Sequence, residues 1–231
     1  MELKILTWNM SYCQRSEEQR KGAWDFLEAL DVDIAILQET KPSFEYSKNR
    51  NIIFNSLSAK DGWGSSIISK KYNTFKHSFF SCYEGSPALL CYDFLINEDN
   101  AVTIINLYGI IDSNGYCTTT VHHMLSDITP VVWEKQNELI VMAGNLNTSA
   151  QWDDTHKLVF DRISDMGFSD CTKEQFGESK RTLIRDTPFP YQDDYIFIKG
   201  QIHKKWKIKI YDSKKMLNYS DHFPIELTIE L

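Results

Sequence analysis

Short apolar runs, separated by turn-forming residues, recur along almost the whole chain and limit the folds it can adopt. Most runs are too short for helices and are rich in Ile, Val, Leu and Phe, which is typical of strands. Some runs are continuously apolar and others alternate with polar residues, so strands buried on both faces are expected beside strands with one wet face. The expected strands are Leu3–Asn9, Asp33–Gln38, Asn51–Leu57, Ser65–Ser69, Lys76–Cys82, Leu89–Ile96, Val102–Tyr108, Leu139–Ala143, Asp194–Lys199, Trp206–Tyr211 and Pro224–Glu230.

Three other segments have helical spacing. Apolar residues recur every three or four positions in Glu17–Leu30, and Ser16 is available as the N-cap. Val121–Glu134 predicts a second helix, with an interruption at Pro130, and Thr155–Met166 predicts a third. Because helices come singly between many strands, the sequence predicts an α/β (α+β) fold, with two mostly antiparallel sheets packed together and helices outside.

Size and composition indicate one globular domain spanning residues 1–231. The chain has 231 residues, 42% of them hydrophobic, and a single core can serve roughly 250 residues. Neither a membrane span of about 18 apolar residues nor a signal peptide is expected. The five cysteines, Cys13, Cys82, Cys91, Cys117 and Cys171, are odd in number and form no Cys-x-x-Cys pair, which predicts reduced thiols and a cytoplasmic location.

The charge balance is acidic. The formal net charge is −7, from 25 basic and 32 acidic residues. Proteins that coat nucleic acid without specificity are normally basic, because neutralisation of phosphates supplies most of their affinity. Broad, tight duplex binding is therefore not expected, although metal ions held by carboxylates would reverse the sign locally.

Polar residues recur where the apolar runs begin or end. They are Asn9, Glu39, Asn145, Asn147, Asp194, Asp221 and His222. Each alone has a structural interpretation, since Asp and Asn often cap turns and a Glu at a strand end usually faces water. Their repetition favours a shared polar site, because strand ends converge at the rim of a sandwich and loops on a rigid scaffold commonly carry function.

These residue types suit one kind of chemistry. Carboxylate oxygens are the ligands of Mg²⁺, which commonly uses only one or two of them, so Glu39 and Asp221 would suffice. Asn side chains can hold phosphate oxygens or orient water without adding charge. An Asp beside a His fixes the imidazole tautomer and stabilises its charged form, as Asp194 can do for His222.

A series of motifs extends this site over almost the whole chain. The motifs are Thr7-Trp8-Asn9-Met10, Ile36-Leu37-Gln38-Glu39-Thr40, Gly64-Ser65-Ser66-Ile67-Ile68-Ser69, Asn106-Leu107-Tyr108, Gly144-Asn145-Leu146-Asn147, Asp194-Tyr195-Ile196-Phe197 and Ser220-Asp221-His222-Phe223-Pro224. In composition and order they resemble the endonuclease/exonuclease/phosphatase superfamily (DNase I-like). Ser-Asp-His-x-Pro and the early Gln-Glu are the most specific pieces.

The resemblance implies a four-layered α/β/β/α sandwich with the site at one end of its two sheets. It implies hydrolysis of a phosphate ester by in-line attack of water, with Mg²⁺, or Mn²⁺ in its place, as cofactor. Glu39 would hold the metal with Asn9 and Asp221. His222, oriented by Asp194, would balance charge on the scissile phosphate. Asn147 would bind that phosphate and help to place the water, and Tyr108 would hydrogen-bond nearby.

Asn145 departs from the family pattern. The family usually has Gly-Asp-x-Asn, and the expected aspartate orients or deprotonates the attacking water. An amide cannot accept that proton, and a positioned general base is worth about 100- to 10,000-fold in rate. Either Asn145 is an engineered or single-site change in an active enzyme, introduced to trap substrate or suppress toxicity, or the natural protein is a weak or inactive relative. The first explanation is favoured, because the other motif positions are intact.

Three further residues are candidate substrate contacts. Trp63 could stack on a base or sugar, or equally cover the end of the sandwich. Arg181 and Arg185 could contact phosphate, although exposed arginines are more often solvated. The lysine-rich segment around Lys207 could contact a phosphate backbone, but its alternation favours the wet face of a protected strand.

Three functions are consistent with the sequence. The preferred one is a monomeric magnesium-dependent nuclease acting on DNA or RNA, weakened by Asn145. The second is a phosphodiesterase or phosphatase for a small or lipid phosphate. The third is a catalytically silent domain that binds a phosphate ligand or a partner protein. The fold alone does not choose among them.

Overall fold

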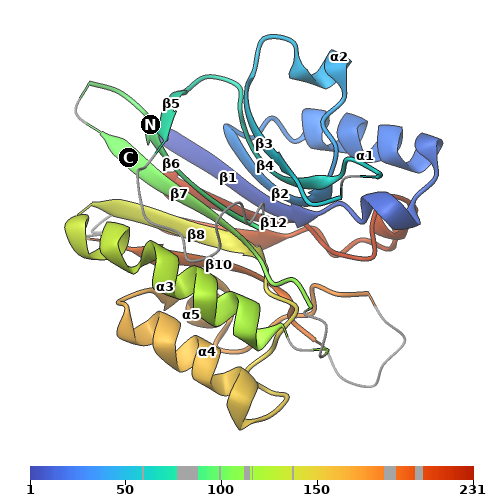
Figure 1. Ribbon diagram of the computed structural model, residues 1–231. Coiled ribbons are helices and arrows are strands. Elements are labelled where there is room, and N and C mark those ends of the chain that lie inside the picture. The colour runs from blue at the N-terminus through green and yellow to red at the C-terminus, as the bar shows by residue number, and fades with distance from the viewer. Residues whose placement is uncertain are drawn as a thin grey trace.

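Two six-stranded sheets pack face to face in the computed structural model, with helices on both outer sides (Figure 1). The structure describes residues 1–58, 60–76, 88–98, 100–111, 115, 117–136, 138–184, 191–200 and 205–231. The predicted sandwich of two sheets flanked by helices is confirmed. The expected strand Lys76–Cys82 falls almost wholly outside the described residues, and the strand described before it is β5 (Asn73–Lys76).

The first sheet contains both ends of the chain. Its order is β11 (Trp206–Ile210), β12 (Ile225–Glu230), β1 (Glu2–Asn9), β2 (Ile34–Thr40), β4 (Gly64–Ser69) and β3 (Asn51–Ser56). Only β1 and β2 pair in parallel, joined through α1, and the other neighbours are antiparallel. Edge strand β11 exposes Lys207 and Lys209 while Ile208 is buried, which matches the predicted wet face.

The second sheet repeats this plan. Its order is β5, β6 (Leu89–Leu95), β7 (Ala101–Tyr108), β8 (Leu139–Asn145), β10 (Asp194–Lys199) and β9 (Ser169–Asp170). Here β7 and β8 form the parallel pair, connected through α3. In each sheet a parallel pair therefore brings two strand C-termini to the same edge, which is where the candidate site residues lie.

Helices cover the outer faces. They are α1 (Glu17–Ala29), α2 (Phe44–Ser47), α3 (Thr118–Glu134), α4 (Asp154–Asp165) and α5 (Cys171–Phe176), with 3-10 turns η1 (Tyr12–Gln14) and η2 (Lys214–Asn218). The short elements α2, α5 and β9 were not predicted. Ser16 caps α1 with Gln19 in a reciprocal capping box, as its sequence suggested. The expected interruption of α3 at Pro130 is wrong, because the helix continues to Glu134.

The core consists of three apolar layers. The central layer lies between the sheets and includes Ile5, Ile36, Ile104 and Ile196, all fully buried. The other two layers lie between the sheets and their helices. Because the central strands are covered on both faces, their sequences are continuously apolar, as expected for doubly buried strands.

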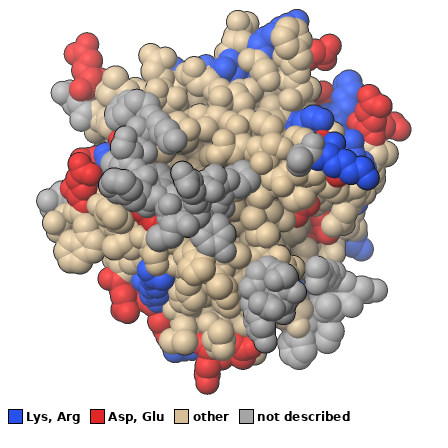
Figure 2. Space-filling view, in the orientation of Figure 1, with Lys and Arg blue, Asp and Glu red and all other residues tan. Residues whose placement is uncertain are grey.

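Basic and acidic side chains are mixed on the face seen in Figure 2, and much of that face is formed by uncharged residues. Basic and acidic groups lie next to one another at the upper right of that view. Such a mixed face fits the acidic overall balance and differs from the single-sign surface of a duplex-coating protein. Within the described part of the chain, every helix is too short or too polar to cross a bilayer.

Candidate active site

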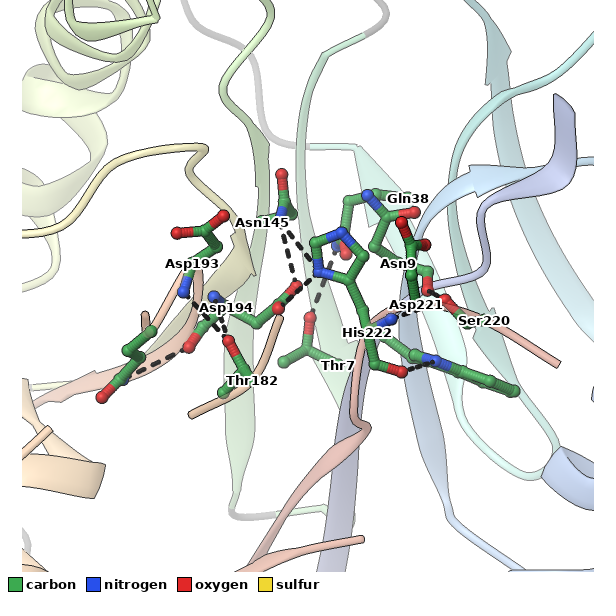
Figure 3. Close-up of polar contacts among 12 residues, drawn as sticks. Thr7, Asn9, Gln38, Asn145, Thr182, Asp193, Asp194, Ser220, Asp221 and His222 are labelled. Carbon is green, nitrogen blue, oxygen red and sulfur yellow. Dashed lines mark hydrogen bonds and ion pairs between the residues drawn. The ribbon is translucent and has the colours of Figure 1, made fainter. Parts of the chain in front are cut away.

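The candidate site lies where strands of both sheets end together. Asn9 ends β1 and Asn145 ends β8, while Asp194 begins the antiparallel strand β10 and is paired with Asn145. Figure 3 shows the imidazole of His222 between Asn145 and Asp194 on one side and Asn9 and Asp221 on the other. The site therefore contains residues from both sheets and lies where the ends of the two sheets meet.

Asp194 and His222 form a buried pair. His222 Nδ1 lies 2.7 Å from Asp194 Oδ2, and the two side chains are 8% and 0% exposed. Backbone contacts hold both residues, since Ser220 Oγ accepts from His222 N (3.0 Å) and Trp8 Nε1 donates to His222 O (3.0 Å). Thr182 Oγ1 accepts from Asp194 N over 3.0 Å. The imidazole is thus fixed before any substrate arrives.

Two opposing effects set the charge of His222. Burial disfavours the charged imidazole and lowers its pKa. The carboxylate of Asp194 and the hydrogen bond to it act more strongly in the other direction, helped by Asp221 and Asp193. Together they raise the pKa of His222 from 6.5 to about 9. His222 is therefore positively charged at neutral pH and suited to stabilising negative charge.

Asn145 touches this pair from within the protein. It is 0% exposed, and its Nδ2 lies 3.3 Å from Asp194 Oδ1 and 3.4 Å from His222 Nδ1. No donor in the described part of the chain reaches its Oδ1, which is also buried. An unpaired buried carbonyl oxygen is costly. It indicates an acceptor position suited to a donor such as water.

Glu39 occupies a strained position on β2. The pairing of β2 with β4 shifts between Leu37 and Thr40, and Glu39 has a φ of 45° at this bulge. Its Oε1 accepts hydrogen bonds from Asn9 Nδ2 (3.1 Å) and Tyr108 Oη (2.7 Å). Burial and the Glu39 charge raise the pKa of Tyr108 well above its usual range, so the phenol stays a donor.

Hydrogen bonds connect Glu39 to Asp221. Asn9, which donates to Glu39, accepts from Ser11 N over 2.9 Å, and the Ser11 hydroxyl donates to Asp221 Oδ1. Ser11 Oγ also lies 2.9 Å from Ser220 Oγ, which donates to the carbonyl of Asn9. Sequence reasoning missed the roles of Ser11 and Ser220, although Ser220 stands within the motif that carries Asp221 and Ser11 directly follows the motif that carries Asn9.

This group has the donors that a magnesium or manganese ion needs. The described residues contain no group of three or more His, Cys, Asp or Glu side chains placed to hold a metal ion. Mg²⁺ commonly takes only one or two carboxylates and keeps water or phosphate in its other positions. Glu39 and Asp221 supply those carboxylates, and both described hydrogen bonds to Glu39 use Oε1 alone. The donor set therefore fits a hard divalent cation and not a structural zinc ion.

Asn147 lies on the side of the site nearest Tyr108. It has a φ of 48°, and its Nδ2 donates to the carbonyl of Gly109 over 2.9 Å. A side-chain hydrogen bond also links it to Tyr108. Ser11, Glu39 and Asn147 thus make up three of the five non-glycine residues with positive φ in the described ranges, and all three lie at this site. Backbone strain is concentrated here.

The proposed substrate contacts are less well placed. Trp63 packs edge-on against Tyr108, with 6.4 Å between ring centroids, and so lies near Glu39. Arg181 is half-buried and directly precedes Thr182, which holds the backbone of Asp194. Arg185 lies outside the described residues.

A buried amide pair ties the two sheets together behind the site. Gln38 Nε2 of β2 donates to Asn106 Oδ1 of β7 over 2.8 Å. Asn106 Nδ2 in turn donates to the carbonyls of Leu37 (3.1 Å) and Ser66 (3.0 Å). These contacts fix the separation of the sheets, and hence the distance between the Glu39 side and the Asp194 side.

Comparison with known proteins identifies the family of the chain. The sequence model described as "Endonuclease/Exonuclease/phosphatase family" matches residues 6–222. The chain belongs to this family. No curated protein sequence matches it significantly. The resemblance inferred from the motifs is therefore confirmed at the level of family and fold.

Solved structures of this fold align over essentially the whole chain. An AP endonuclease from Archaeoglobus fulgidus has a TM-score of 0.75 at 18% identity, covering 99% of this chain and 100% of that one. The endonuclease domain of TRAS1, a telomere-specific non-LTR retrotransposon, has a TM-score of 0.73 at 13% identity, covering 100% and 99%. D. rerio TDP2 complexed with a single-strand DNA product has a TM-score of 0.70 at 14% identity, covering 100% and 99%. At these identities the fold is what the proteins share.

Proposed function

We propose that this protein is a divalent-metal-dependent phosphodiesterase that hydrolyses nucleic acid, and that Asn145 slows it. The observation that carries this proposal is the buried Asp194–His222 pair. Asn9 and Asp221 lie on the other side of its imidazole (Figure 3), and Asn9 donates a hydrogen bond to Glu39. A charged imidazole opposite two carboxylates suits a site that holds a phosphate between a cation and a metal ion.

Each side chain has a role in this proposal. Glu39 and Asp221, with Asn9, would hold Mg²⁺ or Mn²⁺, which when bound supplies Lewis-acid stabilisation of phosphate charge. His222 donates from Nε2 to a phosphate oxygen, and Asp194 keeps the ring charged and oriented. Asn147 donates a hydrogen bond on the opposite side of the phosphate, and Tyr108, whose hydroxyl donates to Glu39, holds that carboxylate nearby.

Asn145 is where this chemistry is weakened. The amide Nδ2 points to Asp194 and His222, and only Oδ1 remains as an acceptor. Oδ1 can accept a hydrogen bond from the attacking water and so orient it. It cannot take up the proton, which must leave to solvent. Binding of substrate is then retained while the hydrolytic step is slow.

The solved structures that share this fold support a nucleic-acid substrate. They include AP endonucleases, a retrotransposon endonuclease domain and a TDP2 complexed with single-strand DNA product. The interspersed surface charges favour contact with a short stretch of strand over coating of a duplex. A monomeric, single-domain, cytoplasmic protein remains part of the proposal.

A small phosphate ester is the second candidate substrate. The loop after Asn147 exposes Asp153 and Asp154, which disfavour a long polyanion on that side. A silent phosphate-binding or partner-binding domain is the third candidate, and Asn145 is the observation that favours it.

The deciding experiment measures cleavage in Mg²⁺ and in EDTA. Single- and double-stranded DNA, RNA and bis(p-nitrophenyl) phosphate are offered to the natural chain, to Asn145→Asp and to His222→Ala as the matched inactive control. The proposal expects Mg²⁺-dependent cleavage of a nucleic acid that His222→Ala loses. Cleavage of the small diester alone supports the second candidate. If neither the natural chain nor Asn145→Asp cleaves any substrate, the enzyme proposal is wrong and the binding domain is favoured.

A further inference from the structure

Arg15 lies beside the candidate site and has no role in the function proposed above. It directly follows the 3-10 turn η1, and its side chain is only 15% exposed. Its Nη2 lies 3.3 Å from Asp221 Oδ1, the same oxygen that accepts from the Ser11 hydroxyl. Arg15 is therefore in direct contact with a proposed metal ligand.

The hydrogen bonding of Arg15 is incomplete. A guanidinium carries five N–H donors. Within the described part of the chain, the Arg15 side chain makes this one ion pair and no other hydrogen bond, and its Nε is buried without a partner. Arg20 differs, since its Nε donates to the carbonyl of Tyr12 over 2.9 Å. Arg50 Nε is also buried without a described partner, but its Nη1 donates to the carbonyl of Tyr46 over 2.5 Å and its Nη2 donates to Glu28. A buried unpaired donor is costly, so Nε of Arg15 points to an acceptor that the described part of the chain does not supply.

The surroundings identify the chemistry of that acceptor. Burial raises the pKa of the Asp221 carboxyl. The hydrogen bond from the Ser11 hydroxyl and two nearby cations, His222 and Arg15, lower it, and the net shift is downward. The planar fork of a guanidinium matches the oxygens of a phosphate, which can accept two N–H groups at once. A phosphate held by His222 would lie near Asp221, which Arg15 contacts.

We propose that Arg15 exchanges partners when substrate binds. It pairs with Asp221 until a divalent cation takes that carboxylate, and it then donates to the substrate phosphate. This inference rests on the proposed function. Arg15 and a metal ion compete because both are cations drawn to the same carboxylate. Their exchange couples the binding of metal to the binding of phosphate.

The test measures the binding of metal and the binding of phosphate separately. Calorimetry measures Mn²⁺ binding, and fluorescence anisotropy measures binding of a labelled single-stranded phosphorothioate DNA with and without Mn²⁺. Arg15→Met is expected to bind Mn²⁺ about fivefold more tightly, because a competitor is gone. It is expected to bind DNA in Mn²⁺ about tenfold more weakly, because a charge-assisted contact is lost. Arg15→Lys keeps the charge without the fork and restores only part of the DNA affinity.

Lys21→Met is the matched control. Lys21 is 73% exposed on the adjacent helix α1 and pairs with Asp25, so its loss removes one positive charge without touching the site. It is expected to change both affinities by less than about twofold.

Weaker Mn²⁺ binding by Arg15→Met would overturn the exchange, because Arg15 would then only position Asp221. An unchanged DNA affinity of Arg15→Met would also overturn it. If circular dichroism shows that Arg15→Met does not fold, Arg15→Lys becomes the deciding variant. A DNA affinity of Arg15→Lys equal to that of the unsubstituted protein would contradict binding of the phosphate by the guanidinium. Absence of Mn²⁺ binding by the natural chain would overturn the metal-dependent function itself. Mn²⁺ binding that is identical in the natural chain and Arg15→Met overturns the exchange alone.

Discussion

Asn145 donates its amide hydrogen to Asp194 across 3.3 Å, so the residue at the expected general-base position meets its neighbour as a donor. A carboxylate at residue 145 would lie as close to Asp194 without a hydrogen between them. Two neighbouring carboxylates repel, and one of them then binds a proton more readily. Asp194 would therefore make a carboxylate at residue 145 more basic, whereas the charged imidazole of His222, 3.4 Å from residue 145, would act in the opposite direction.

Asn145→Asp is expected to raise kcat by about 100- to 10,000-fold in Mg²⁺, because a base that accepts the proton of the attacking water is restored. The rate is measured on bis(p-nitrophenyl) phosphate and on DNA. Asn145→Ala serves as the control, since it opens the same space without a base. Equal rates for the natural chain and Asn145→Asp would remove residue 145 from the proton-transfer step.

Glu39→Gln is expected to weaken Mn²⁺ binding about tenfold or more, since it removes a ligand charge and even residues behind a ligand contribute 10- to 100-fold. Asp221→Ala is expected to have the same effect. Isothermal titration calorimetry measures both, with Glu138→Gln as the control, because Glu138 is 52% exposed and pairs with Lys135. Unchanged affinity in either variant would exclude that residue from the metal site.

The stability of the protein is expected to depend on pH through His222. Its pKa is raised to about 9 in the folded chain, above the 6.5 of the unfolded chain. The stabilisation is therefore complete below pH 6.5 and is lost as pH rises through 9, which corresponds to roughly 3 kcal/mol. Urea denaturation between pH 6 and pH 9.5 measures it against His222→Gln. Parallel profiles for the two proteins would show that His222 is not held in its charged form.

Two glycines provide a matched test of backbone geometry at the site. Gly144, beside Asn145, has a φ of 149°, and a Cβ there would lie 1.9 Å from the carbonyl oxygen of Leu107. Gly144→Ala is expected to lower the free energy of unfolding by about 3 kcal/mol or more. Gly177 has a φ of 73° with nothing within 4 Å of an added Cβ, so Gly177→Ala is expected to cost only about 1 kcal/mol. Similar midpoints in urea would contradict the close approach at Gly144.

The sequence predicts most of the fold because its central strands are buried on both faces. Continuous apolar runs such as Leu139–Ala143 mark such strands without any knowledge of their partners. Pro130 shows the limit of local reasoning. Val131 and Val132, which follow it, are buried against the second sheet, and this packing keeps α3 intact despite a penalty of about 3 kcal/mol for an internal proline.

The candidate site follows from sequence only in part. Asn9, Glu39, Asp194 and His222 are predictable because motif residues stand at strand ends, which converge in a sandwich. The bulge that gives Glu39 its positive φ is not predictable, because it depends on how β2 pairs with β4. Arg15 escapes detection for a related reason. It reaches Asp221 through a turn, across a separation in the chain that no local pattern encodes.

The strained backbone at Ser11, Glu39 and Asn147 has a consequence for how this protein can change over time. Left-handed conformations of non-glycine residues cost of order 1 kcal/mol each, and glycine at these positions would relieve that cost while removing the side chains. Selection for heat resistance alone would therefore favour variants that have lost the site. Retention of all three residues requires selection for what they do, and a laboratory evolution scheme must reward turnover at every round to keep them.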